Sequence, residues 1–155
     1  MQPVSRALGA YSMSVKIEKL QELHAYCMKF AETMLEEHQE FYPFGALIDT
    51  ENELRAVGAD LGTEYPDVAE QYEFLQKAMQ VRAQNKEVLA YAIALNVNVP
   101  EQYSSPSRDG VRVLIESEND ARYIYTPYSI AENPIEITFM EAFAVEIPPQ
   151  IFNSE

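Results

Sequence analysis

The sequence predicts an α+β fold in which an antiparallel sheet of about five strands carries two main helices. Three observations support this expectation: two segments with helical apolar spacing, one long segment that alternates strictly, and several short β-rich segments between turn residues. The 155 residues suffice to bury a core without disulfides. We expect a flexible leader over residues 1–12 and a single domain over residues 13–155.

The first helix is predicted from Ser14, a suitable N-cap, to about His38. Apolar residues recur there at steps of three and four and define one face: Ile17, Leu20, Leu23, Cys27, Phe30 and Met34. A β-hairpin follows, with strands over 40–48 and 54–58 and a turn between them. Pro43 removes a backbone donor and belongs at a strand start or edge, and Gly45 indicates a bulge or a close backbone approach.

A second helix is expected over residues 66–85, because Pro66 and Asp67 are start signals and Glu70 completes a capping-box pattern. The clearest strand follows over 87–99, where large apolar residues alternate with small or polar ones. One of its faces carries Ala90, Ala92 and Ala94. Such a face permits close packing of a helix, or it lines a shallow groove.

The last third of the chain predicts a loop over 100–110 and a meander with strands over 111–116 and 122–128. The segment 135–147 fits either a helix or a strand that breaks at Glu141. Its β-rich start and the Pro148-Pro149 stop favour an extended segment. The predicted order is therefore helix, hairpin, helix, meander and tail.

The net charge of −14 is the largest departure from an average protein. Such a surface repels phosphate backbones and anionic membranes, so we expect neither nucleic-acid binding nor membrane binding. Twelve acidic residues and one basic residue, Arg55, lie between Glu32 and Glu73. This run is either a solvated surface or an acidic docking face for a basic partner. The candidate acidic contacts are Glu36, Glu37, Glu40 and Glu53.

Cys27 is the only cysteine, and no apolar stretch suits a signal peptide or a membrane span, so we expect a cytoplasmic protein. His24 and Cys27 are three residues apart, a spacing that suits a thiol–imidazole pair or metal ligands, but no second cluster completes a metal site. His38 lies about 21 Å from His24 along the predicted helix. The glycines form no phosphate-binding loop. We therefore expect no catalytic residue, no metal and no cofactor.

Aromatic residues are the remaining candidates. Tyr42 and Phe44 lie in the predicted hairpin, and Tyr123 and Tyr125 share one face of a predicted strand. Tyrosine is common at interfaces, because its ring packs while its hydroxyl stays hydrated. These side chains either lie under a helix or form an exposed contact surface for a partner or a second copy.

The segment Glu40-Phe41-Tyr42-Pro43-Phe44-Gly45, followed by a hairpin, a helix and a long strand, resembles a group of small uncharacterised bacterial proteins with the same hairpin entry. The Tyr125-x-Pro127-Tyr128 pattern resembles a second feature of that group. The resemblance covers most of residues 20–130 and implies an accessory or immunity-like protein that neutralises a toxin. The element order is also similar to that of roadblock and profilin-like domains, in topology only.

Three functions follow as hypotheses. The first is a non-catalytic protein of the bacterial cytoplasm, an adaptor or toxin neutraliser that binds a basic protein or forms a homodimer. The second is a small-molecule sensor or carrier with a pocket between sheet and helix, near Ala90, Ala92, Ala94 and Tyr123. The third is an enzyme that uses carboxylates or tyrosines, which would need a concave site with a buried Asp or Glu.

Overall fold

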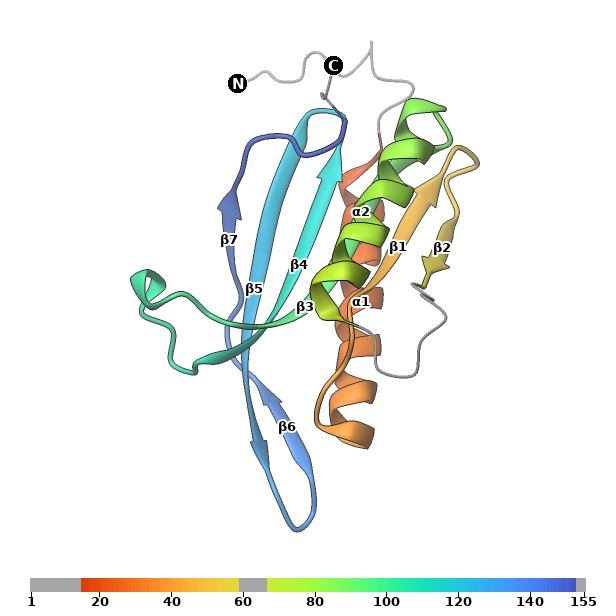
Figure 1. Cartoon of the computed structure of the whole chain (residues 1–155). Coiled ribbons are helices and arrows are strands. Elements are labelled where there is room, and N and C mark those ends of the chain that lie inside the picture. The colour runs from red at the N-terminus through yellow and green to blue at the C-terminus, as the bar shows by residue number, and fades with distance from the viewer. Residues whose placement is uncertain (1–14, 59–66, 153–155) are drawn as a thin grey trace.

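A computed structural model describes residues 15–58 and 67–152 (Figure 1). In chain order its elements are α1 (Ile17–His38), β1 (Phe44–Asp49), β2 (Leu54–Val57), α2 (Val68–Gln84), β3 (Val88–Asn98), the 3-10 helix η2 (Glu101–Tyr103), β4 (Asp109–Ser117), β5 (Asp120–Ala131), β6 (Glu136–Phe139) and β7 (Phe143–Glu146). The predicted α+β class and element order are confirmed. The expected leader and the expected N-cap Ser14 lie outside the described residues.

The strands form one antiparallel sheet in the order β2-β1-β3-β4-β5-β6, and β7 also pairs with β5. The sheet therefore has seven strands rather than about five. The extra strands come from the last segment, which is extended and breaks at Glu141 as its pattern favoured. Its two halves pair with different parts of the long strand β5: Tyr125 lies opposite Phe143, and Tyr128 lies opposite Phe139.

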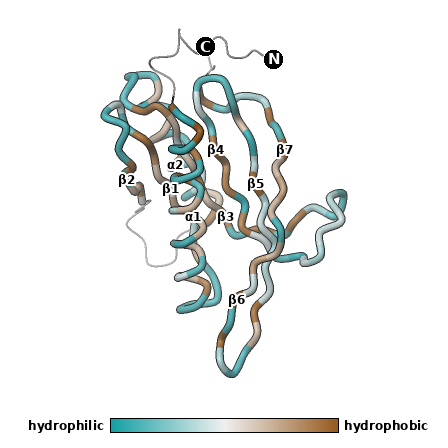
Figure 2. Tube along the Cα trace, turned by 180° about the vertical axis from the view of Figure 1, so that it is seen from behind, coloured by the Kyte–Doolittle hydropathy of each residue, from teal (hydrophilic) through white to brown (hydrophobic). Residues whose placement is uncertain are grey.

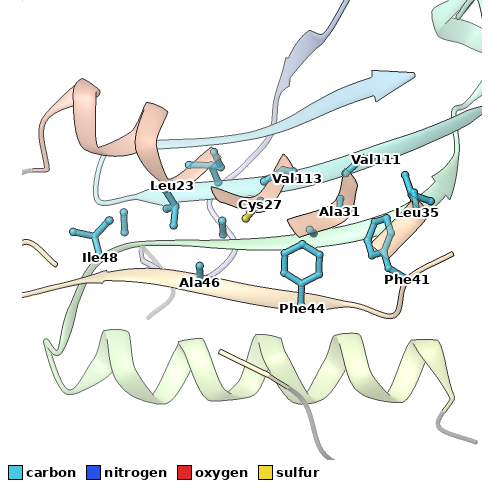
Figure 3. Close-up of a cluster of buried hydrophobic side chains, with 14 of the residues drawn as sticks. Leu23, Cys27, Ala31, Leu35, Phe41, Phe44, Ala46, Ile48, Val111 and Val113 are labelled. Carbon is cyan, nitrogen blue, oxygen red and sulfur yellow. The ribbon is translucent and has the colours of Figure 1, made fainter. Parts of the chain in front are cut away.

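Helix α1 covers one face of the sheet and forms the larger core cluster (Figure 3). Its buried stripe is Leu23, Cys27, Ala31 and Leu35. Ala90, Ala92 and Ala94 of β3 are fully buried beneath it, because their small side chains let a helix lie close to the strands. Of the two readings of the alanine face, the structure therefore shows helix packing rather than a groove.

Helix α2 packs on the opposite face, mainly on β1 and β3. The Asp67 carboxylate accepts hydrogen bonds from the backbone N–H groups of Ala69 (2.8 Å) and Glu70 (3.3 Å), which confirms the predicted helix start. Gly45 permits the close approach expected of it. A Cβ there would lie 3.2 Å from Met79 Cε of α2 and 3.1 Å from a β3 carbonyl oxygen.

The sheet is thus a middle layer between the two helices, and its hydrophobic residues run along the strands (Figure 2). Hydrophilic residues gather at the β4–β5 turn and at the tip of the β5–β6 hairpin, which extends beyond the two helices (Figures 1 and 2). Among the described residues, neither helix is long and apolar enough to cross a membrane.

Candidate functional site

The structure distributes the eight predicted contact residues over separate parts of the molecule. Four of them lie together where α1 ends and the chain turns into β1: Glu36, Glu37, Glu40 and Tyr42. Phe44 belongs to the α1-side core, Glu53 lies next to the β1–β2 turn, and Tyr123 and Tyr125 lie on the α2 side of the sheet. The predicted set is therefore not one continuous surface.

The acidic end of α1, defined here as Glu36, Glu37, Glu40 and Tyr42, is exposed throughout. Glu36 and Glu37 lie in the last helical turn, where the helix macrodipole is negative and acidic side chains are unfavourable. No Lys or Arg of the described residues pairs with any of the three glutamates; Glu37 has only His38 Nε2, 3.8 Å away. Packing inside the domain does not account for this local concentration of negative charge.

The C-terminal end of α1 is capped by Gln39 and not by the side chains of these glutamates. Gln39 takes a left-handed conformation with φ of 58°, and its backbone N–H donates to the Leu35 carbonyl at 2.9 Å. The Gln39 side-chain amide donates to the Glu36 carbonyl at 3.1 Å. The carboxylates of the last turn are consequently free to face solvent or a partner.

The two hairpin aromatics have different surroundings. The Tyr42 side chain is 46% exposed. Phe44 is buried, with its ring centroid 4.6 Å from that of Phe30 and 5.6 Å from that of Phe41. The strand pattern could not separate the two, because alternation does not reveal which face meets a helix. Tyr42 remains a candidate contact, whereas Phe44 acts as core.

Glu53 belongs to the turn between β1 and β2. This turn lies at the opposite end of β1 from the C-terminal end of α1 (Figure 1), a strand length of about 17 Å away. The turn is organised by Asp49, whose carboxylate accepts from the backbone N–H of Glu51 (2.9 Å) and Glu53 (3.0 Å) and from Arg55 Nε (2.7 Å). The hydrogen bond from Arg55 is the largest of the effects that lower the Asp49 pKa below its usual range. The charged groups of this turn therefore interact with one another and with the backbone of the turn itself.

A second candidate is the arginine–tyrosine cluster, on the α2 side of β4, β5 and β7. Its members are Tyr72 of α2, Tyr103 of η2, Arg112 of β4, Tyr123 and Tyr125 of β5, and Phe143 of β7. The Arg112 guanidinium carbon lies 4.1 Å from the Tyr123 ring centroid and 5.6 Å from that of Tyr72.

The rings of this cluster also contact one another. Tyr125 stacks on Phe143 at 5.3 Å, and the Tyr103 ring lies 5.5 Å from both. Burial is the largest cause that raises the pKa of Tyr72 and of Tyr125, and the Arg112 charge opposes it in both. Both phenols are therefore neutral near pH 7. The sequence paired Tyr123 and Tyr125 correctly but gave no sign that Arg112 lies among them.

The structure does not bring together the residues of the pocket expected near the alanine face. In the sheet register Leu114 lies opposite Tyr123 and Val113 lies opposite Ala94, so the Tyr123 side chain points away from the face that bears the alanines. A site between sheet and helix at Tyr123 would involve α2, not α1.

Sequence reasoning missed Glu116, whose side chain is fully buried. Its carboxylate accepts a 2.6 Å hydrogen bond from the Tyr91 hydroxyl and bonds from three consecutive backbone N–H groups: Gln150 at 3.0 Å, Ile151 at 3.1 Å and Phe152 at 3.1 Å. Phe152 also stacks on Tyr91, with centroids 6.0 Å apart. Glu116 thus fastens the C-terminal segment to the sheet.

A weak signal for Glu116 was present in the sequence. Residues 112, 114 and 116 share a face of β4, and Leu114 on that face is apolar, so a charge at position 116 faces either solvent or an internal partner. The partner lies 34 to 36 residues later in the chain. No local pattern specifies such a distant contact.

Cys27 packs in the core beneath α1, and His24, three residues earlier on the same helix, is partly buried. Cys27 is fully buried, and burial raises the pKa of its thiol to about 12. His24 Nε2 is enclosed without a hydrogen-bond partner in the described part of the chain, and burial lowers its pKa. Within residues 15–58 and 67–152, no three His, Cys, Asp or Glu side chains are placed to hold a metal ion.

The chain has no match among the known proteins with which it was compared. No family model matches the chain, and searches of curated proteins and of solved structures find no match.

Proposed function

We propose that this protein is a non-catalytic binding protein whose acidic end of α1 engages a basic protein partner, as an adaptor or a toxin-neutralising protein would. The observation that carries the proposal is the placement of Glu36 and Glu37 in the last turn of α1. Each opposes the helix macrodipole at a cost of about 0.3–1 kcal/mol. No Lys or Arg of the described residues offsets this cost, whereas the cations of a basic partner would.

Neighbouring features suit such an interface. Tyr42 adds an exposed aromatic ring beside the glutamates, and Phe30 of α1 keeps 37% of its surface exposed. Aromatic rings at the centre of a charged patch supply contact area, while surrounding carboxylates accelerate the encounter and orient the partner. The chain charge of −14 adds long-range attraction for a basic protein.

The test compares two triple variants that change the net charge equally. Glu36→Gln/Glu37→Gln/Glu40→Gln removes the patch, and the control Glu87→Gln/Glu101→Gln/Glu118→Gln removes three exposed glutamates elsewhere. Affinity capture from the source cell should yield a basic protein that salt releases. Titration calorimetry should then show at least about tenfold weaker binding for the patch variant than for the control.

Equal weakening of both triple variants would mean that binding depends on net charge alone, and the proposed surface would be wrong. A captured partner that binds both variants with unchanged, salt-insensitive affinity would contradict the electrostatic basis altogether. Circular dichroism of each variant establishes that the fold is intact.

A further inference from the structure

The face of the sheet that carries the arginine–tyrosine cluster is not covered by a helix in the way that the α1 side is. Helix α2 packs mainly on β1 and β3, and only Tyr72 reaches the cluster from it. Five of the six members are partly exposed: Tyr72, Tyr103, Arg112, Tyr123 and Phe143. A ring face and a cation are therefore accessible side by side between α2 and η2.

Among the arginines of the described residues, Arg112 alone is partly buried without a paired carboxylate, since Arg82 and Arg108 also lack one but are exposed. No carboxylate of the described residues lies within 4.0 Å of its guanidinium, whereas Arg55 and Arg122 each pair with an aspartate. Its Nε atom is buried without a hydrogen-bond partner in that same part of the chain. Burying a guanidinium is costly unless its donors are satisfied; the rings beside Arg112 and its side-chain interactions with Tyr72 and Tyr125 compensate in part but leave Nε without an acceptor.

An anion with two acceptor oxygens would satisfy donors of this kind. A guanidinium presents a planar fork of donors that matches a carboxylate in bidentate geometry. The surrounding rings favour a ligand whose body is flat and apolar, because offset and edge contacts between rings are favourable.

The negative net charge of the protein favours a small anionic ligand over a large one. The chain carries −14, so a polyanion or an acidic protein is repelled as a whole. A small monoanion experiences mainly the field of Arg112, since charges further than about 8 Å away are screened at physiological salt. We propose that the arginine–tyrosine cluster binds a small planar monocarboxylate, with its carboxylate on Arg112 and its ring against the tyrosines and Phe143.

The site is tested with benzoate and 2-naphthoate as probes on the full chain. Each should bind saturably in calorimetry and shift the NMR signal of Arg112 Nε–H. Benzamide lacks the charge and acetate lacks the ring, so both should bind at least about tenfold more weakly than benzoate.

Variants then locate the site. Arg112→Gln should abolish benzoate binding, and Arg112→Lys should weaken it severalfold because an ammonium cannot form the bidentate pair. Arg82→Gln, which removes an exposed arginine of α2, should leave it unchanged. The wild-type NMR titration decides the question even if an Arg112 variant does not fold. No saturable response to either probe, or equal binding by Arg112→Gln and Arg82→Gln, would overturn the proposal.

Discussion

Replacing Glu116 tests how the C-terminal segment is held. Glu116→Ala removes the acceptor of four hydrogen bonds, one from Tyr91 and three from the backbone of residues 150–152. Hydrogen bonds to a charged group contribute about 1.5–3 kcal/mol each, so losing four would cost about 6–12 kcal/mol if their donors stayed buried and unpaired.

The C-terminal segment can instead rearrange at a lower cost, which limits the loss of stability in Glu116→Ala. It can detach and return its N–H groups to water, at the expense of the apolar contacts of Ile151 and Phe152. Fully burying one such side chain is worth about 1.5–3 kcal/mol. We therefore expect Glu116→Ala to lower the free energy of unfolding by about 3–5 kcal/mol. Glu116→Gln should cost less, about 1–3 kcal/mol, because one oxygen remains while the amide nitrogen faces backbone donors.

Denaturant unfolding measures the loss, and hydrogen exchange shows where it occurs. Amides of residues 150–152 should lose protection in both variants, while the amides of α1 keep theirs. Glu118→Gln, an exposed neutralisation two residues away, is the control and should stay within about 0.5 kcal/mol of wild type. A loss below about 1 kcal/mol for Glu116→Ala, with unchanged exchange at residues 150–152, would refute the fastening role.

Three further outcomes are expected. Glu37→Gln should raise the free energy of unfolding by about 0.3–1 kcal/mol, because it removes an unfavourable charge at the end of α1. Thermal unfolding measures this change, and a lower stability of the variant would contradict the prediction. The folded-state pKa of His24 is lowered, so the unfolded chain binds more protons below about pH 6.5, and stability should fall as pH drops from there. His24→Leu should flatten this dependence, whereas exposed His38→Gln should not. The Cys27 thiol, with its pKa raised to about 12, should react with a thiol reagent at pH 8 only as fast as the protein unfolds.

Local patterns predicted most elements of this fold, because each was specified by residues within one segment. The Asp67 carboxylate does cap α2, the alternation over 87–99 is strand β3, and the break at Glu141 separates two strands. These features depend on contacts between neighbours in the sequence. The structure of the segment 135–147 was harder to predict, since its two halves become strands only by pairing with β5.

Features set by distant contacts could not be predicted. The pattern of each helix shows an apolar stripe but not which face of the sheet receives it, so the placement of α1 and α2 on opposite faces had to be observed. For the same reason the sequence pattern could not predict the contact of Arg112 with Tyr72, which lies forty residues earlier in the chain. Tyr123 was recognised as an aromatic candidate, but the cation beside it was not.

The charged residues of this protein separate according to whether the fold compensates them. Exposed Asp67 caps a helix, and buried Glu116 offsets its desolvation by holding a backbone segment, so each carboxylate is used by hydrogen bonds inside the domain. Glu36 and Glu37 oppose a helix dipole, and Arg112 lies among rings without a carboxylate from the described residues. Selection for stability alone would replace such residues with neutral ones. Their presence is explained if a basic partner and a small carboxylate supply the missing interactions, at two surfaces of opposite local charge.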